Sequence, residues 1–198
     1  MREKLLNGYT VMRGNISRET EKTIEKISKY INKNLKTYSR TKFIDGMYDL
    51  MLELLIEVYS ITSKMIRDLY DGLEIERLSD EEIMKLTYSA DGKELRERIE
   101  EHYDNVMKRI ESERKDYFLH RMMLIVNTES LTVSNGILHK KLAKYAVYAE
   151  VTNSDDDICW EHEECEYWLR KGKIPVDELT ELPPYHPDCE CSVIYYFE

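Results

Sequence analysis

Proline and cysteine are confined to one end of this chain. All four prolines and all four cysteines follow residue 150: Pro175, Pro183, Pro184, Pro187, Cys159, Cys165, Cys189 and Cys191. Proline removes a helical hydrogen bond and clashes with the preceding turn, so the long stretch before it is free to form long helices. We therefore expect an α+β fold that is mainly α, with long helices followed by a small C-terminal α/β module that contains an antiparallel strand pair.

Apolar residues recur at helical spacing through the proline-free part. They predict five helices, at Ser17 to Arg40, Phe43 to Tyr70, Ser79 to Tyr88, Lys93 to Arg114, and Asp116 to Tyr145 with an irregularity near Gly136. Gly72 and the segment 90–92 are natural breaks between them. We divide the chain into a helical body at 1–115, with a basic first helix, and a C-terminal module at 116–198.

After Lys144 the periodicity changes from helical to alternating. Residues 144–152 and 191–198 are β-rich and read as strands, and a short helix is expected from Trp160 to Leu169. If the two strands pair antiparallel, Cys159 and Cys191 come close together.

No segment has the length or character of a membrane span or a secretory signal. No run of about 18 apolar residues occurs. The first residues also lack the order that is typical of a secretory signal peptide, in which a positively charged region is followed by an apolar region and then by small residues. We expect a protein made in the cytoplasm that has no membrane partner.

Charge is spread unevenly along the chain, although the total is -10. Residues 1–42 hold 11 Lys/Arg against 4 Asp/Glu, whereas residues 146–198 hold 3 against 14. Seven basic residues recur near the helical period opposite the apolar series: Arg18, Lys22, Lys26, Lys29, Lys33, Lys36 and Arg40. They form either a solvated face or a contact for DNA phosphate or an acidic protein surface.

Two short clusters of cysteine and histidine lie about 20 residues apart. Their spacings are C-x2-H-x2-C and H-x2-C-x-C, and their members are Cys159, His162, Cys165, His186, Cys189 and Cys191. Structural zinc sites take four sulfur or nitrogen ligands, commonly as two short chelating pairs, so at most four of these six would hold one Zn²⁺. Free thiols, disulfides and a catalytic metal are the alternatives.

Motifs of known catalytic chemistry are missing. The sequence has no Gly-rich phosphate loop, no G-x-S-x-G elbow, no H-E-x-x-H and no recognisable catalytic dyad. A non-enzymatic role is therefore expected.

Several motifs near the carboxy terminus, and the order in which they follow one another, resemble the signature of the MuF-like minor head proteins of tailed phages, also called phage head morphogenesis proteins. The matching pieces are VYAEVT, SDDDIC, EYWLRKGKIPVD, PPYHPDCEC and SVIYYFE, and the upstream helical stretch IVNTESLTVSNGILHKKLAKYAV also resembles the family. The resemblance covers about residues 115–198. Two positions depart from the pattern. His162 stands where the family has a second early cysteine, with Cys165 three residues further on, and Glu190 replaces a usual basic residue.

The resemblance implies a minor capsid protein, present in few copies inside the virion head, made in the host cytoplasm and associated with the portal protein. It also implies other head or scaffold proteins as partners, and a role in DNA packaging or ejection. Two other classes stay open. One is a zinc-stabilised nucleic-acid-binding module that uses the basic series, and the other is a metal-dependent effector enzyme.

Overall fold

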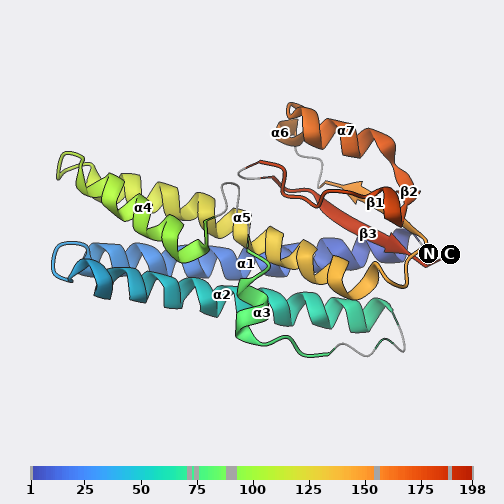
Figure 1. Cartoon of the computed structure of the whole chain (residues 1–198), viewed down its shortest axis with the longest axis horizontal. Helices are drawn as coiled ribbons and strands as arrows, with labels where there is room; N and C mark the ends of the chain where they lie inside the picture. Colours follow the sequence, from blue (N-terminus) through green and yellow to red (C-terminus); the bar gives the residue numbers. More distant parts are fainter. Residues whose placement is uncertain are drawn as a thin grey trace.

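The computed structural model describes residues 2–70, 73, 76–87, 93–153, 157–186 and 189–197. It confirms the expected class, because long helices make up most of the molecule and a small antiparallel sheet lies near the carboxy terminus (Figure 1). The described helices that precede the sheet are α1 (Arg2–Asn34), α2 (Arg40–Leu69), α3 (Asp80–Met84), α4 (Leu95–Met107) and α5 (Arg114–Leu142). From here on these helices are called the body, and the part of the chain that follows α5 is called the module. Helices α1, α2 and α5 run alongside one another (Figure 1).

Helix α1 begins at Arg2, well before the predicted start at Ser17. Leu5, Tyr9, Met12 and Ile16 are all buried, and their spacing continues the apolar stripe of the later turns. The helix ends at Asn34, so Lys36 lies in the following turn. Arg40 opens α2, whose N-cap Ser39 accepts a hydrogen bond from the main-chain nitrogen of Lys42. The predicted single basic helix is thus corrected to a helix, a turn and the start of a second helix.

Helix α5 is continuous through Gly136, so the predicted irregularity is wrong. A Cβ at Gly136 would lie 3.2 Å from Leu86 Cδ2, which shows that the glycine allows the segment after α3 to approach closely. The predicted helix after Lys93 is also shorter, since α4 ends at Met107. Gly72 and residues 90–92, named above as breaks, lie outside the described residues.

The sheet has the strand order β2-β1-β3, in which both pairings are antiparallel. Its strands are β1 (Tyr148–Thr152), β2 (Lys173–Pro175) and β3 (Ser192–Tyr196). The predicted pair is confirmed, with Tyr148 opposite Tyr196 and Thr152 opposite Ser192, although β1 starts four residues later than expected. β2 was not predicted.

The module packs against the body through β3, whose five residues are all buried. The Tyr70 hydroxyl donates to the Tyr195 carbonyl oxygen at 2.9 Å, and His139 Nδ1 lies 2.8 Å from the Tyr195 hydroxyl. One hydrophobic core joins body and module, and α5 contacts both. The division at residue 115 stays a prediction. Within the described part of the chain, no helix is both long and apolar enough to cross a membrane.

Candidate metal centre

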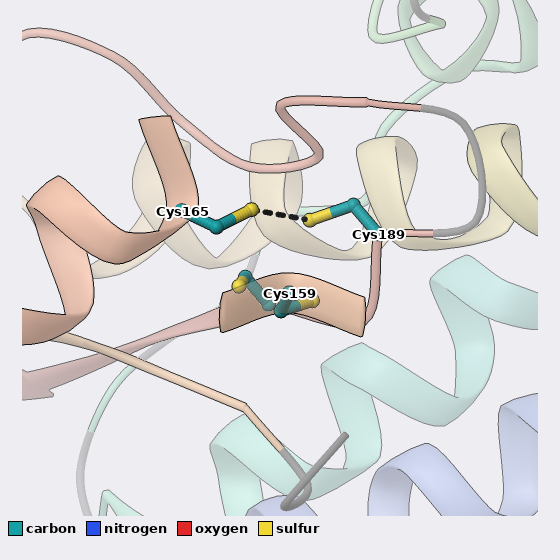
Figure 2. A group of neighbouring side chains, drawn as sticks. Cys159, Cys165 and Cys189 are labelled. Carbon is teal, nitrogen blue, oxygen red and sulfur yellow. Dashed lines mark hydrogen bonds between the residues drawn. The ribbon is translucent and has the colours of Figure 1, made fainter. Parts of the chain in front are cut away.

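Four cysteines from three separate segments meet in the C-terminal module. Cys159 lies on the short helix α6 (Asp157–Trp160), Cys165 lies near the start of α7 (Glu163–Lys171), and Cys189 and Cys191 precede β3. All four side chains are buried, and their Sγ atoms lie within 4.8 Å of one another. Figure 2 shows the thiols of Cys165 and Cys189 pointing toward each other, with their Sγ atoms 3.6 Å apart. The β1–β3 pairing creates this meeting, because it places the segment after β1 beside the segment before β3.

The sulfur spacing fits a tetrahedral metal ion. Zinc bound at about 2.3 Å by four thiolates sets neighbouring sulfurs about 3.8 Å apart. All four cysteines are free thiols, so the disulfide alternative does not describe this structure. The group consists of soft sulfur donors, with no carboxylate or imidazole among them, and such sets select Zn²⁺ over Mg²⁺ or Ca²⁺. These residues therefore fit a metal ion of the zinc type.

The four thiols differ in acidity. Hydrogen bonds from the Cys159 and Cys191 thiols lower the pKa of Cys189 well below its ordinary value, whereas burial raises the pKa of Cys165 above its ordinary value. Without a metal, the group thus stabilises one thiolate better than several, because neighbouring negative charges repel. A divalent cation would remove that repulsion and allow the remaining thiols to ionise.

The two histidines of the predicted ligand set lie outside this group. The imidazole rings of His162 and His186 stack on each other, with centroids 3.7 Å apart and an angle of 15° between the planes. The helix predicted from Trp160 to Leu169 is corrected here, because α6 ends at Trp160 and α7 begins only at Glu163, with His162 as its N-cap residue. The stack joins the two cysteine-bearing segments beside the thiols.

Arg13 of α1 brings a positive charge next to the cysteines. Its Nη2 lies 3.3 Å from Glu190 Oε2, and its side chain is only 15% exposed. Burial lowers the pKa of Arg13, while Glu190 and the thiols of Cys191, Cys159 and Cys189 act in the opposite direction. Arg13 was missed in the sequence because the helix was expected to begin after it. The pattern Leu5, Tyr9, Met12 and Ile16 was the signal that could have placed it.

The basic series lies elsewhere, along α1 and the start of α2. Five of its members are ion-paired with carboxylates: Lys22 with Glu19, Lys26 with Glu53, Lys29 with Glu25, Lys36 with Glu111, and Arg40 with Glu100 and Asp104. Arg18 and Lys33 belong to the same helix, α1. The pairs reduce the positive charge that this surface presents, and a contact with DNA or an acidic partner stays a prediction.

Comparisons with protein-family models, with curated proteins and with solved structures find no match to this chain. The resemblance to MuF-like proteins accordingly depends on the motif residues named above.

Proposed function

We propose that this chain is a minor head morphogenesis protein of a tailed phage, in which a structural zinc ion fastens the C-terminal module. The proposal of a zinc ion depends on one observation, the clustering of four buried thiols. They belong to Cys159, Cys165, Cys189 and Cys191. The ordered motif resemblance supports the phage part. The partners proposed are the portal protein and other head or scaffold proteins.

The zinc ion would be held by the four thiolates and would supply a cross-link between α6, α7 and the segment before β3. Four protein ligands complete a tetrahedral shell, so such an ion has no position for a water molecule that reacts. Hydrogen bonds from the protein also attach this segment. Asn135 of α5 donates to the carbonyl oxygens of Pro183 and Cys191, which fixes the cysteine-bearing segment on the body.

The structural role is supported by the way the module is attached. One hydrophobic core joins the module to the body, as in a protein that contributes a fixed surface to an assembly. DNA packaging or ejection would then depend on this protein's contacts with the portal.

The proposal predicts that a portal gene lies directly beside this one. It is tested by co-expression of this chain with that portal protein, followed by size-exclusion chromatography of the untagged proteins. A stable complex is expected, and mass spectrometry of purified phage heads should detect this chain in few copies per particle. Absence from purified heads, together with failure to bind the adjacent portal protein, would contradict the proposal. A gene beside an immunity gene of a toxin system would favour the effector alternative.

A further inference from the structure

An ion pair between Arg13 and Glu190 connects α1 with the cysteine centre. The Arg13 Nη2 lies 3.3 Å from Glu190 Oε2, although 177 positions separate the two residues along the chain. Glu190 stands between Cys189 and Cys191, two of the four clustered cysteines. Arg13, Cys189 and Glu190 also line the same cleft. The Arg13 guanidinium therefore lies beside the thiol cluster, although it belongs to a helix at the other end of the sequence.

The surroundings of Arg13 allow its charge to act on the thiols. Its side chain is 15% exposed, so water and salt screen the charge only weakly, whereas the Glu190 side chain is 48% exposed. Burial lowers the pKa of Arg13, and Glu190 and the thiols of Cys191, Cys159 and Cys189 act in the opposite direction. Because an electrostatic interaction is mutual, Arg13 in turn favours the thiolate forms of these cysteines.

Zinc binding makes the thiol cluster more negative. When four thiols bind one Zn²⁺, four Zn–S bonds form, the thiol protons pass to the solvent, and the centre has a net charge of about -2. The metal-free cluster stabilises one thiolate better than several, so its charge is about -1. A fixed cation beside the cluster therefore stabilises the zinc-bound state more than the metal-free state, and a fixed carboxylate does the opposite. The sign of each contribution does not depend on the other charges nearby.

We propose that Arg13 is a positioning residue of the zinc centre, whose buried guanidinium offsets the negative charge of the zinc–thiolate group. This role rests on the zinc centre proposed above and not on the phage assignment. Zinc affinity then depends on the contact between α1 and the module, in which α1 also touches β3. By linkage, the bound ion strengthens that contact to the same extent as the contact strengthens zinc binding. Zinc thus holds the module on α1 in addition to joining the segments of the module.

The test uses the full chain, purified under reducing conditions, and measures the zinc dissociation constant by competition with a chromophoric chelator. Arg13→Gln should weaken zinc binding at least about tenfold, because a poorly screened cation is lost. Arg13→Lys keeps the charge and should restore most of the affinity. Arg170→Gln is the matched control. Arg170 is also paired with a glutamate, Glu166, but its side chain is 72% exposed, so this substitution should change zinc affinity less than about twofold.

Glu190→Gln separates an effect of charge from the simple loss of an ion pair. If charge acts on the centre, removal of this carboxylate should strengthen zinc binding about threefold, which is opposite in sign to the effect of Arg13→Gln. If the ion pair only holds the cysteine segment in place, both substitutions should weaken binding. Glu190 is half exposed, so its replacement is compatible with folding. It decides the matter alone if Arg13→Gln does not fold, because unchanged or weaker binding in Glu190→Gln overturns the role of Arg13.

Failure of this role and failure of the zinc centre give different results. A wild-type chain that binds no zinc overturns both. A wild-type chain that binds zinc, together with an Arg13→Gln variant that binds it as tightly, overturns only the role of Arg13. An Arg13→Lys variant that binds no better than Arg13→Gln does the same, because a charge at this position would then have no effect.

Discussion

Asn135 and Cys191 are joined by a hydrogen bond in which the Asn135 Nδ2 donates to the Cys191 carbonyl oxygen at 3.1 Å. The same nitrogen donates to the carbonyl oxygen of Pro183 at 3.2 Å. One fully buried side chain of α5 thus holds both the proline and the cysteine parts of the loop before β3.

Replacing Asn135 by leucine should lower the free energy of unfolding by about 2 to 4 kcal/mol, because two buried carbonyl oxygens lose their donor. Urea unfolding followed by circular dichroism measures this change. The exposed Asn105 of α4 provides the control, and Asn105→Leu should stay within about 0.5 kcal/mol of the wild type. Equal effects of the two substitutions would show that the Asn135 hydrogen bonds do not stabilise the fold.

Each of the four cysteine-to-serine substitutions should reduce the bound zinc from about one ion per chain, measured by elemental analysis of protein kept under reducing conditions. Free zinc a thousandfold above its dissociation constant adds about 4 kcal/mol to stability. Its removal by a chelator should therefore lower the melting temperature of the wild type by about 8 to 16 °C. His162→Ala should retain the zinc, since His162 lies outside the sulfur group. A metal-free protein with thiols paired in solution would contradict the proposed centre.

Arg98 and Glu129 form a second buried connection, between α4 and α5. The Arg98 Nη2 lies 2.5 Å from Glu129 Oε1, and the two side chains are 12% and 0% exposed. Arg98→Met should destabilise the protein by about 3 to 5 kcal/mol, because it leaves a carboxylate buried without its cation. The double variant Arg98→Met/Glu129→Leu should recover most of that loss in the same denaturation experiment. Equal stability of the single and double variants would argue against the ion pair as the cause.

His139 should make stability depend on pH near neutrality. Burial lowers its pKa below the ordinary 6.5, so the unfolded chain binds this proton more readily than the folded one. The stabilising contribution is complete above pH 6.5 and is lost as the pH falls through the lower, folded pKa. His139→Gln lacks this titration, and the difference in melting temperature between wild type and variant should shrink from pH 7.5 to pH 5. A constant difference would exclude His139 as the cause.

The DNA prediction for the basic series is tested with a 20-base-pair duplex and fluorescence anisotropy. Reversing Lys26, Lys29 and Lys33 to glutamate should weaken binding more than tenfold at low salt if these residues bind phosphate. The slope of log affinity against log salt should fall by about 0.9 for each phosphate that the variant no longer neutralises. Reversal of Lys64, Lys85 and Lys93 on other elements is the charge-matched control. Unchanged affinity in the first triple variant would contradict the prediction.

The sequence predicted the helices best where apolar spacing is regular, as in α2, whose observed bounds differ from the prediction by only a few residues. The first half of α1 was missed because Gly8, Gly14 and several polar residues weaken the pattern, although four buried apolar residues carry it. β2 was missed because it has three residues and ends in Pro175, and its pairing with β1 defines it. Such a strand has little local signal.

For the candidate site, spacing alone selected the six residues among which the four clustered thiols are found. It could not separate cysteine from histidine, because that choice depends on how α6, α7 and the loop before β3 meet in space. The stacked rings of His162 and His186, and the approach of Arg13 from α1, are consequences of tertiary packing. Local sequence patterns do not report such packing.

The burial of all five β3 residues affects the order in which the protein can mature in a cell. The ribosome synthesises the chain from its amino terminus. The Tyr70 hydroxyl therefore cannot donate its hydrogen bond to the Tyr195 carbonyl oxygen until 125 further residues have been made. Until β3 has been made, a nascent chain exposes the apolar surfaces of α1 and α5 that this strand will cover. Chains interrupted before residue 192 should therefore be retained by chaperones or degraded, which would favour the survival of chains that have made β3.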